Sequence, residues 1–244
     1  RMTLLILSGT GEGRQIATDL HGQGVDLMIS LAGETRKPKQ QAVPTRIGGF
    51  GGTQGFRNFL NDAKITAVLD ATHPFASNIT TRTAQVCAGL AVPYCLYLRP
   101  PWVARAQDDW TELSDESDAA QHIEAGSTVF LATGRKTLHR FGDLSKCRLI
   151  CRQIDPPDGP FPFENGEYLI GRPPFSVSDE IALFKRLNVD WLIVKNAGGS
   201  ASFSKLEAAR ALQIKVGMIK RPKMPVATTV SRIEQAIQWG KAHG

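Results

Sequence analysis

The sequence predicts an α/β protein with two domains, each built on a parallel sheet, and a cleft between them. Three observations lead to this fold class. Short apolar patterns alternate with helical patterns along the 244 residues, a glycine-rich turn joins the first strand to the first helix, and a proline-rich break interrupts the alternation near residue 100. Such alternation is typical of parallel sheets with right-handed crossovers, so we expect two Rossmann-like domains.

The first domain is expected over residues 1–100. Its strands are short apolar runs, and its helices are the segments between them with apolar residues at helical spacing. The expected strands are 3–8, 25–31, 44–47, 66–70 and 93–98, and the expected helices are 13–22, 53–63 and 76–90. Arg99-Pro100-Pro101-Trp102 can neither continue a helix nor form a central strand, so we expect a linker at 99–107.

The second domain is expected over residues 101–244, where the alternation resumes. The expected strands are 109–113, 127–132, 147–152, 167–170, 190–195 and 214–219, and the expected helices are 115–125, 176–188, 202–212 and 229–242. Segment 155–166 is rich in proline and glycine, so we expect a loop there, with a mobile lid as one role for it.

Composition excludes several classes of protein. No apolar run approaches the roughly 20 residues that span a bilayer, and no secretory leader pattern precedes the first strand, so we expect a cytoplasmic location and no membrane partner. Cys87, Cys95, Cys147 and Cys151 form no C-x-x-C pair and are expected to be reduced, buried thiols. No H-E-x-x-H pattern occurs, and we expect no catalytic metal.

The charge pattern indicates an acidic small molecule rather than a nucleic acid. The net charge is +6, from 29 basic and 23 acidic residues. The basic residues do not form a dense run; they recur singly at predicted strand ends, which suits a pocket better than a groove along a phosphate backbone. A solvated basic surface is the plainer interpretation of the same charge.

The turn after the first strand is suited to a phosphate. Ser8-Gly9-Thr10-Gly11-Glu12-Gly13-Arg14 leads into a helical pattern, and a helix N-terminus presents free N–H groups and the positive end of its dipole. Gly9 and Gly11 match the first two glycines of G-x-G-x-x-G, but the third position holds Arg14. A tight turn that binds no ligand is the alternative.

The second strand indicates which dinucleotide fits. An acid at this strand end normally binds the ribose hydroxyls of NAD, but here the strand end is Ser30-Leu31-Ala32-Gly33. Arg36 and Lys37 follow and suit the 2′-phosphate of NADPH, whereas the acidic Glu34 favours NADH. With two cations against one acid, we favour NADPH over NADH. The loop Gly48-Gly49-Phe50-Gly51-Gly52 lets a ligand approach the backbone, with Phe50 placed to lie against a ring; a flexible turn is the alternative.

The fourth strand is followed by Asp70-Ala71-Thr72-His73-Pro74-Phe75-Ala76, which brings an acid, a hydroxyl and an imidazole to the same sheet edge. Histidine is the natural proton carrier near neutral pH. The alternative is a capping side chain and a packed histidine. No G-x-S-x-G elbow and no P-loop occur, so serine-hydrolase and P-loop chemistry are excluded.

Cations follow three strands of the second half, in Thr133-Gly134-Arg135-Lys136, Lys195-Asn196-Ala197-Gly198-Gly199 and Lys220-Arg221-Pro222. Cations that converge on one sheet edge bind carboxylates well, and arginine does so in bidentate fashion. The alternative for each one alone is a surface ion pair.

Taken together, these stretches resemble the precorrin-6A reductase family of cobalamin biosynthesis. The resemblance rests on the opening loop, on Ile47-Gly48-Gly49-Phe50-Gly51, on Asp70 to Ala76, on Tyr97-Leu98-Arg99-Pro100, on Thr133-Gly134-Arg135 and on Lys195 to Gly199. It implies two Rossmann-like domains and NADPH-dependent reduction of the precorrin-6A macrocycle, a ring with acetate and propionate arms, to precorrin-6B. Other enzymes of the pathway are conceivable partners, and no nucleic acid is expected.

The resemblance and the residues together give an expected site. The first domain holds the cofactor through Thr10, Gly11, Arg14, Ser30, Gly49, Phe50 and Thr72, with Arg36 and Lys37 reaching the 2′-phosphate. The second domain holds the substrate carboxylates through Arg135, Lys136, Lys195, Lys205 and Arg221, with Arg99 and Arg152. His73 or an ordered water supplies the proton. Two alternatives from other classes are a non-catalytic module that senses a dinucleotide and a two-domain glycosyltransferase that uses a nucleotide-sugar.

Overall fold

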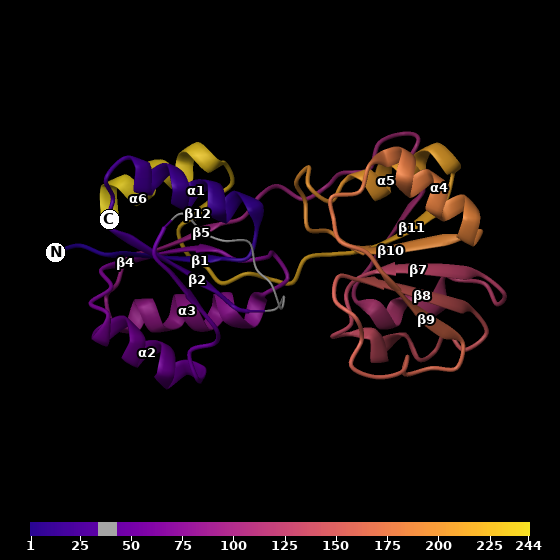
Figure 1. Cartoon of the computed structure of the whole chain (residues 1–244), viewed down its shortest axis with the longest axis horizontal. Coiled ribbons are helices and arrows are strands. Elements are labelled where there is room, and N and C mark those ends of the chain that lie inside the picture. The colour runs from indigo at the N-terminus through magenta and orange to yellow at the C-terminus, as the bar shows by residue number, and fades with distance from the viewer. Residues whose placement is uncertain (34–42) are drawn as a thin grey trace. The chain divides into compact units, whose positions relative to one another are not determined.

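The chain folds into two units, each built on a six-stranded parallel sheet (Figure 1). The computed structural model describes residues 1–33 and 43–244. Unit 1 consists of Arg1–Pro100 and Pro222–Gly244, and unit 2 is Pro101–Arg221. The predicted fold class, α/β with two parallel sheets, is confirmed.

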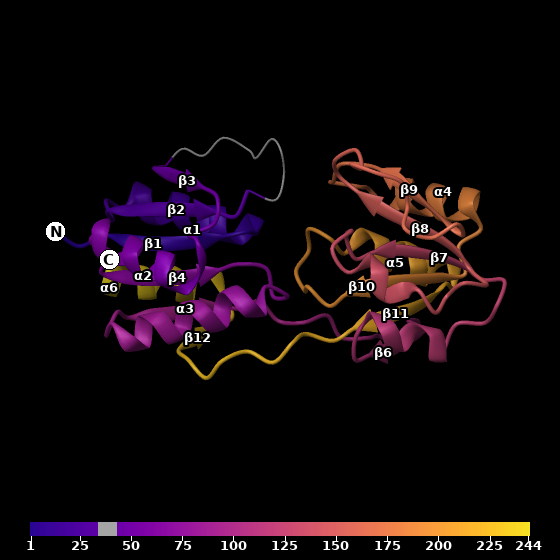
Figure 2. The same ribbon diagram turned by 90° about the horizontal axis from the view of Figure 1, so that it is seen from below.

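The sheet of unit 1 has the strand order β12-β5-β4-β1-β2-β3 (Figure 2). This is the order of the dinucleotide-binding fold, with β1 and β4 side by side at its centre. Both central strands are buried along their whole length, because helices cover both faces of the sheet. The strands are β1 Leu4–Ser8, β2 Leu27–Leu31, β3 Thr45–Ile47, β4 Ala67–Ala71, β5 Tyr94–Tyr97 and β12 Thr229–Val230.

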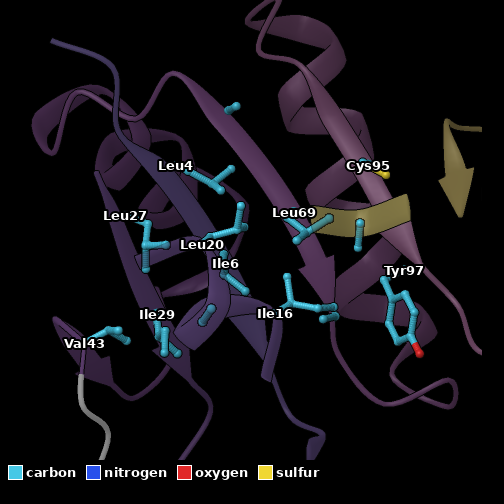
Figure 3. Close-up of a cluster of buried hydrophobic side chains, with 14 residues drawn as sticks. Leu4, Ile6, Ile16, Leu20, Leu27, Ile29, Val43, Leu69, Cys95 and Tyr97 are labelled. Atoms are coloured by element: carbon cyan, nitrogen blue, oxygen red, sulfur yellow. The ribbon is translucent and has the colours of Figure 1, made fainter. Parts of the chain in front are cut away.

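Two helices cover each face of this sheet: α1 (Gly11–Gly22) and α6 (Ile233–His243) on one face, α2 (Gly52–Asp62) and α3 (Ser77–Gly89) on the other (Figure 1). Side chains of β1 alternate between the two faces, so Leu4 and Ile6 enter one core and Leu5 and Leu7 enter the other. On the α1 face, Ile16 and Leu20 of the helix lie over the strands (Figure 3).

The end of the chain belongs to unit 1, which differs from the expected second domain at 101–244. The N–H groups of Leu96 and Leu98 donate to the carbonyls of Thr228 and Val230 and so add β12 to the edge of the sheet. A strand of two residues leaves no periodic pattern, and the expected helix 229–242 therefore begins only at Ile233. Helix α6 then approaches α1 closely at Gly240, where a Cβ atom would lie 2.6 Å from a methyl carbon of Leu20.

The sheet of unit 2 has the strand order β6-β11-β10-β7-β8-β9 (Figure 2). Helices α4 (Val177–Leu187) and α5 (Ser204–Leu212) contact each other and cover one face, where Phe130 and Phe184 meet at 5.0 Å between ring centroids. The strands are β6 Trp110–Leu113, β7 Thr128–Ala132, β8 Arg148–Gln153, β9 Gly166–Ile170, β10 Trp191–Lys195 and β11 Lys215–Ile219.

Two short elements of unit 2 differ from expectation. The helix expected at 115–125 is a 3-10 helix, η1 (Glu116–Gln121), with only Glu116 and Ala119 buried, too small an apolar face to stabilise an α-helix. A second 3-10 helix, η2 (Leu138–Phe141), was not expected. Segment 155–166 is a loop up to the start of β9 at Gly166, as predicted.

Two predictions from composition can be compared with the structure. All four cysteines are free and buried, and burial raises the pKa of the Cys87 thiol to about 12 and that of Cys151 to about 11. None of the helices in the described ranges has the length and apolar character needed to cross a bilayer.

Candidate functional site

Two loops of unit 1 meet at the carboxyl edge of its sheet. A Cβ atom added to Gly9, in the loop after β1, would lie 3.5 Å from the backbone nitrogen of His73, in the loop after β4. The Thr10 hydroxyl donates to the carbonyl of Ala71 at 3.2 Å and ties the same loops together. The structure therefore brings Thr10, Thr72 and His73, all predicted site residues, to one place.

Helix α1 begins with features that fit a phosphate. Thr10 is its N-cap, and its hydroxyl accepts a hydrogen bond from the N–H of Gly13 at 3.2 Å. The preceding N–H groups, of Gly11 and Glu12, have no acceptor within the helix and lie at its positive end. A Cβ atom on Gly11 would lie 3.6 Å from Nη2 of Arg14, so this guanidinium folds back over the loop. Free donors and a cation together suit a pyrophosphate.

One predicted substrate residue, Arg99, lies in unit 1. Its Nη1 donates to Oε2 of Glu12 at 2.9 Å, and both side chains are mostly buried. Glu12 would otherwise oppose an anion at the first turn of α1, and Arg99 offsets this charge. Arg99 thus contacts the glycine-rich loop of the proposed cofactor site.

Gly13 takes the structural role that the third glycine has in the dinucleotide fingerprint. A Cβ atom at this position would lie 2.7 Å from Oγ of Ser8 and 3.2 Å from Cβ of Ala71. The third glycine of G-x-G-x-x-G allows close packing of helix on strand, and here Gly13 does so one position early. Arg14 is therefore released from packing and can face the loop.

Arg46 joins Ser30 to the second glycine-rich loop, and sequence analysis missed it. Ser30 on β2 and Arg46 on β3 are partners in the strand register. Nη1 of Arg46 donates to Oγ of Ser30 and to the carbonyl of Gly48, each at 2.9 Å, and Nη2 donates to the carbonyl of Gly49 at 3.0 Å. The strand is only three residues long, so its pattern was too weak to mark Arg46 as a cation at a strand end.

The ring of Phe50 is partly buried and contacts three neighbouring side chains. The Arg46 guanidinium carbon lies 4.0 Å from its centroid, and Phe56 and Phe59 contact it at centroid distances of 4.9 and 5.0 Å. Arg46 therefore contacts both the Phe50 and Phe59 rings and the backbone of Gly48 and Gly49. Arg36 and Lys37, the two residues predicted to bind the 2′-phosphate, lie outside the described residues.

Asp70 organises the loop after β4. Its carboxylate is fully buried and accepts bonds from the N–H and hydroxyl of Thr72, at 3.1 and 2.7 Å, and from the Tyr94 hydroxyl at 2.8 Å. Burial, together with the Asp70 charge, raises the pKa of Tyr94. The loop is thereby held in one shape next to the start of α1.

The orientation of His73 is set by its own loop. Its Nδ1 accepts a hydrogen bond from the N–H of Phe75 at 3.2 Å. A ring nitrogen that accepts carries no proton, so in the neutral imidazole the proton is on Nε2. The half-buried residue therefore presents Nε2–H as a hydrogen-bond donor, and it can act as a general acid only as the imidazolium, in which both ring nitrogens carry protons.

Unit 2 contains a pocket of about 150 Å³ among the carboxyl ends of its strands and the start of α5. Lys205 lines it, and its Nζ donates to the carbonyl of Ser202 at 2.9 Å. Burial, together with the Arg152 charge and opposed by Glu180, lowers the pKa of this ammonium to about 8. Gly134, Arg152 and Glu180 line the same pocket.

Arg152, a predicted carboxylate ligand, already binds a carboxylate of the protein. Nη1 and Nη2 donate to the two oxygens of Glu180 at 2.6 and 2.7 Å, and both side chains are buried. The Phe175 ring lies 3.9 Å from the guanidinium carbon. With Arg152 and Glu180 paired, Lys205 gives the pocket a net positive charge while it is protonated.

The remaining predicted cations are divided between two turns of unit 2. Arg135 and Lys136 are exposed and follow Gly134 of the pocket. Arg221 donates to the carbonyls of Asn196 and Ala197, both at 2.9 Å, next to Lys195 at the end of β10. The structure therefore places Lys205 and Arg152 in one pocket, with Arg135 and Lys136 beside it and Lys195 with Arg221 at another turn.

Comparisons with known proteins agree over the full length of the chain. The family described as precorrin-6x reductase CbiJ/CobK matches residues 3–241. A precorrin-6A reductase of Rhodobacter capsulatus is 37% identical, with 99% of this chain and 96% of the relative covered. One of Rhodococcus erythropolis is 41% identical, with 97% and 96% covered. A solved structure of CobK precorrin-6A reductase superimposes with a TM-score of 0.94 at 37% identity, covering 100% of this chain and 98% of the other.

Proposed function

This chain belongs to the precorrin-6x reductase family, and from that premise we propose that it reduces precorrin-6A to precorrin-6B in cobalamin biosynthesis, with NADPH as the electron donor. The full-length similarity supports the reductase activity, and the strand order of unit 1 supports a dinucleotide cofactor. The observation that carries the cofactor assignment is the start of α1, where free N–H groups and the Arg14 guanidinium surround Gly11.

The cofactor is assigned to unit 1. Gly11 and Arg14 would hold the pyrophosphate, Ser30 and Gly49 would hold the adenosine end, and the loop of Thr72 would border the site. The hydroxyl of Thr10 caps α1 and that of Thr72 donates to Asp70, so these two residues act mainly by fixing the loops. Arg36 and Lys37 remain sequence-based predictions for the 2′-phosphate.

The macrocycle is assigned to unit 2 through its carboxylate arms. One arm enters the Lys205 pocket, where an anion relieves the repulsion between Lys205 and Arg152. Arg135 and Lys136 contact a second arm from the exposed turn beside Gly134. Lys195 is assigned to the same carboxylate-binding residues. Arg152 and Arg221 act indirectly, because Arg152 binds Glu180 and Arg221 holds the turn at Asn196.

The chemistry requires a hydride and a proton. Reduced nicotinamide, when bound, supplies the hydride to one ring carbon of the substrate. The protein positions the reactants, excludes water and delivers the proton to the adjacent atom, and His73 Nε2 or an ordered water fills that role.

The cytoplasm, where thiols stay reduced, suits a chain with four free buried cysteines.

Ligand-induced thermal stabilisation, followed by anaerobic turnover, tests the proposal. Saturating NADPH should raise the melting temperature, because a ligand that binds only the folded state stabilises by about 2.7 kcal/mol at 100 times its Kd. Precorrin-6A should then be consumed together with NADPH in equal amounts. Stabilisation without turnover would favour a dinucleotide sensor, and stabilisation by UDP- or GDP-sugars alone would favour a glycosyltransferase.

A further inference from the structure

The edge of the unit 1 sheet formed by β2 and β3 carries a cation with no acidic partner among the described residues. In the dinucleotide-binding fold, an acid at the end of β2 binds the ribose hydroxyls of the adenosine. Here that strand carries buried Ser30, and its register partner on β3 is Arg46. No ion pair joins Arg46 to a carboxylate in ranges 1–33 and 43–244. Burial disfavours the charged guanidinium and lowers its pKa.

The Arg46 side chain is fixed in place before any ligand arrives. Its bonds to Ser30, Gly48 and Gly49 use three of the five guanidinium N–H groups, and Nε–H and one Nη2–H donate to no residue within 1–33 and 43–244. The Phe50 and Phe59 rings, with centroids 4.0 and 5.0 Å from its guanidinium carbon, support it from one side. Oγ of Ser30 accepts from Arg46, and no acceptor for the Ser30 O–H lies in the described part of the chain.

We propose that Arg46, held by Ser30 and the Gly48–Gly49 loop, binds the 2′-phosphate of the adenosine ribose and makes the enzyme prefer NADPH to NADH. This inference rests on the proposed function and assigns the discrimination to a residue other than Arg36 and Lys37. A planar guanidinium with two unused donors suits a phosphate, and the bond to Ser30 aims it at the end of β2. A ribose 2′-hydroxyl offers no charge to the same group, so NADH gains little from it.

The test is the ratio of the two dissociation constants, measured by titration with NADPH and with NADH. In Arg46→Ala, Kd for NADPH should rise about 10- to 100-fold, as expected for the loss of a charge-assisted contact, and Kd for NADH should rise less than about threefold. Arg46→Lys, which keeps the charge but not the fork, should give an intermediate ratio. Arg232→Ala, which removes an exposed partner of Glu234, is the matched control and should keep the wild-type ratio.

Smaller probes isolate the contact from the rest of the cofactor. Adenosine 2′-monophosphate should compete with NADPH in the wild type and lose that ability in Arg46→Ala, while adenosine 5′-monophosphate should bind both proteins alike. An unchanged NADPH-to-NADH ratio in Arg46→Ala would overturn the inference and leave the proposed function intact. Equal loss of both dinucleotides would also overturn it, since Arg46 would then only shape the loop. A wild type that binds neither would instead contradict the proposed function.

Discussion

The carboxamide of Asn196 forms two hydrogen bonds with the backbone of Trp102, which lies 94 positions earlier in the chain. Its Oδ1 accepts from the Trp102 N–H at 2.7 Å, and its Nδ2 donates to the Trp102 carbonyl at 3.0 Å. The Trp102 indole donates to the carbonyl of Gly199 at 2.7 Å, and Arg221 donates to the carbonyl of Asn196. The turn after β10 thus anchors both ends of unit 2.

Asn196→Ala should loosen the start of unit 2. It leaves the N–H and carbonyl of Trp102 without their side-chain partner, at a cost of about 1–3 kcal/mol. We expect a lower melting temperature and faster tryptic cleavage at the exposed Arg105. Asn58→Ala, which removes an exposed bond to Gln54, is the control and should change the free energy of unfolding by less than about 0.5 kcal/mol. Equal effects of the two variants would show that the anchor is unimportant.

Arg152→Ala should act on stability before it acts on substrate binding. It leaves the buried Glu180 carboxylate without its partner, which should lower the free energy of unfolding by about 3–5 kcal/mol. Arg148→Ala breaks a half-exposed pair with Glu167 and should lower it by less than about 1 kcal/mol. Urea unfolding of both variants measures the difference. The double variant Arg152→Met/Glu180→Leu should be more stable than Arg152→Ala, because no unpaired charge remains. A stable Arg152→Ala protein that binds substrate poorly would restore Arg152 as a direct ligand.

Lys205 should make substrate capture sensitive to pH. The ammonium binds a carboxylate only while protonated, and its pKa is lowered to about 8, so capture is fully present well below pH 8 and declines as the pH rises through that value. We expect kcat/KM of the wild type to fall above pH 8 and that of Lys205→Arg to stay level there. Lys146→Arg, an exposed substitution, should retain the wild-type profile. Coincident profiles for wild type and Lys205→Arg would exclude this role.

The same shift has the opposite effect on the ligand-free protein. The unfolded chain holds the Lys205 proton up to its ordinary pKa of 10.5, whereas the folded protein releases it near 8. The unfolded state therefore binds more protons between these values, and the Lys205 contribution to the free energy of unfolding rises with pH across that window. Lys205→Met should abolish this contribution, which melting curves with and without the substitution would measure.

Gly13→Ala should destabilise unit 1 through a clash with β1. The new methyl carbon meets Ser8 Oγ and Ala71 Cβ, and overpacking of this kind costs about 1–3 kcal/mol. Because Ser8 Oγ is buried without a hydrogen-bond partner in the described structure, adding Ser8→Ala should recover part of the loss. Gly22→Ala, at an open position of the same helix, is the control and should be neutral or slightly stabilising. Melting temperatures of the four proteins compare these effects.

Most of the fold followed from local patterns. Apolar runs such as 4–7 predicted the buried strands, and proline at 100 and 101 predicted the boundary between the units. The strand Thr229–Val230 could not be predicted, because its pairing with β5 is tertiary and two residues show no period. For the same reason the return of the chain to unit 1 left no local signal.

The site was predictable only as residue types at strand ends. The loops of Gly9 and His73 meet because parallel strands share a carboxyl edge, and this much was expected. Partners distant in sequence could not be read from local pattern: Glu180 neutralises Arg152 and Glu12 binds Arg99. Arg46 was overlooked on a weak strand, although it stands directly before Ile47-Gly48-Gly49.

The most direct test of the account is transfer of label from the cofactor to the substrate. NADPH carrying deuterium at the reactive C4 position of nicotinamide would be mixed with precorrin-6A and the enzyme under anaerobic conditions, and the product examined by mass spectrometry. We predict a dihydro product that contains one deuterium from the cofactor and one proton from the solvent, formed in proportion to the NADPH consumed. A reduced product with no cofactor-derived deuterium, from either face of the labelled nicotinamide, would contradict the account.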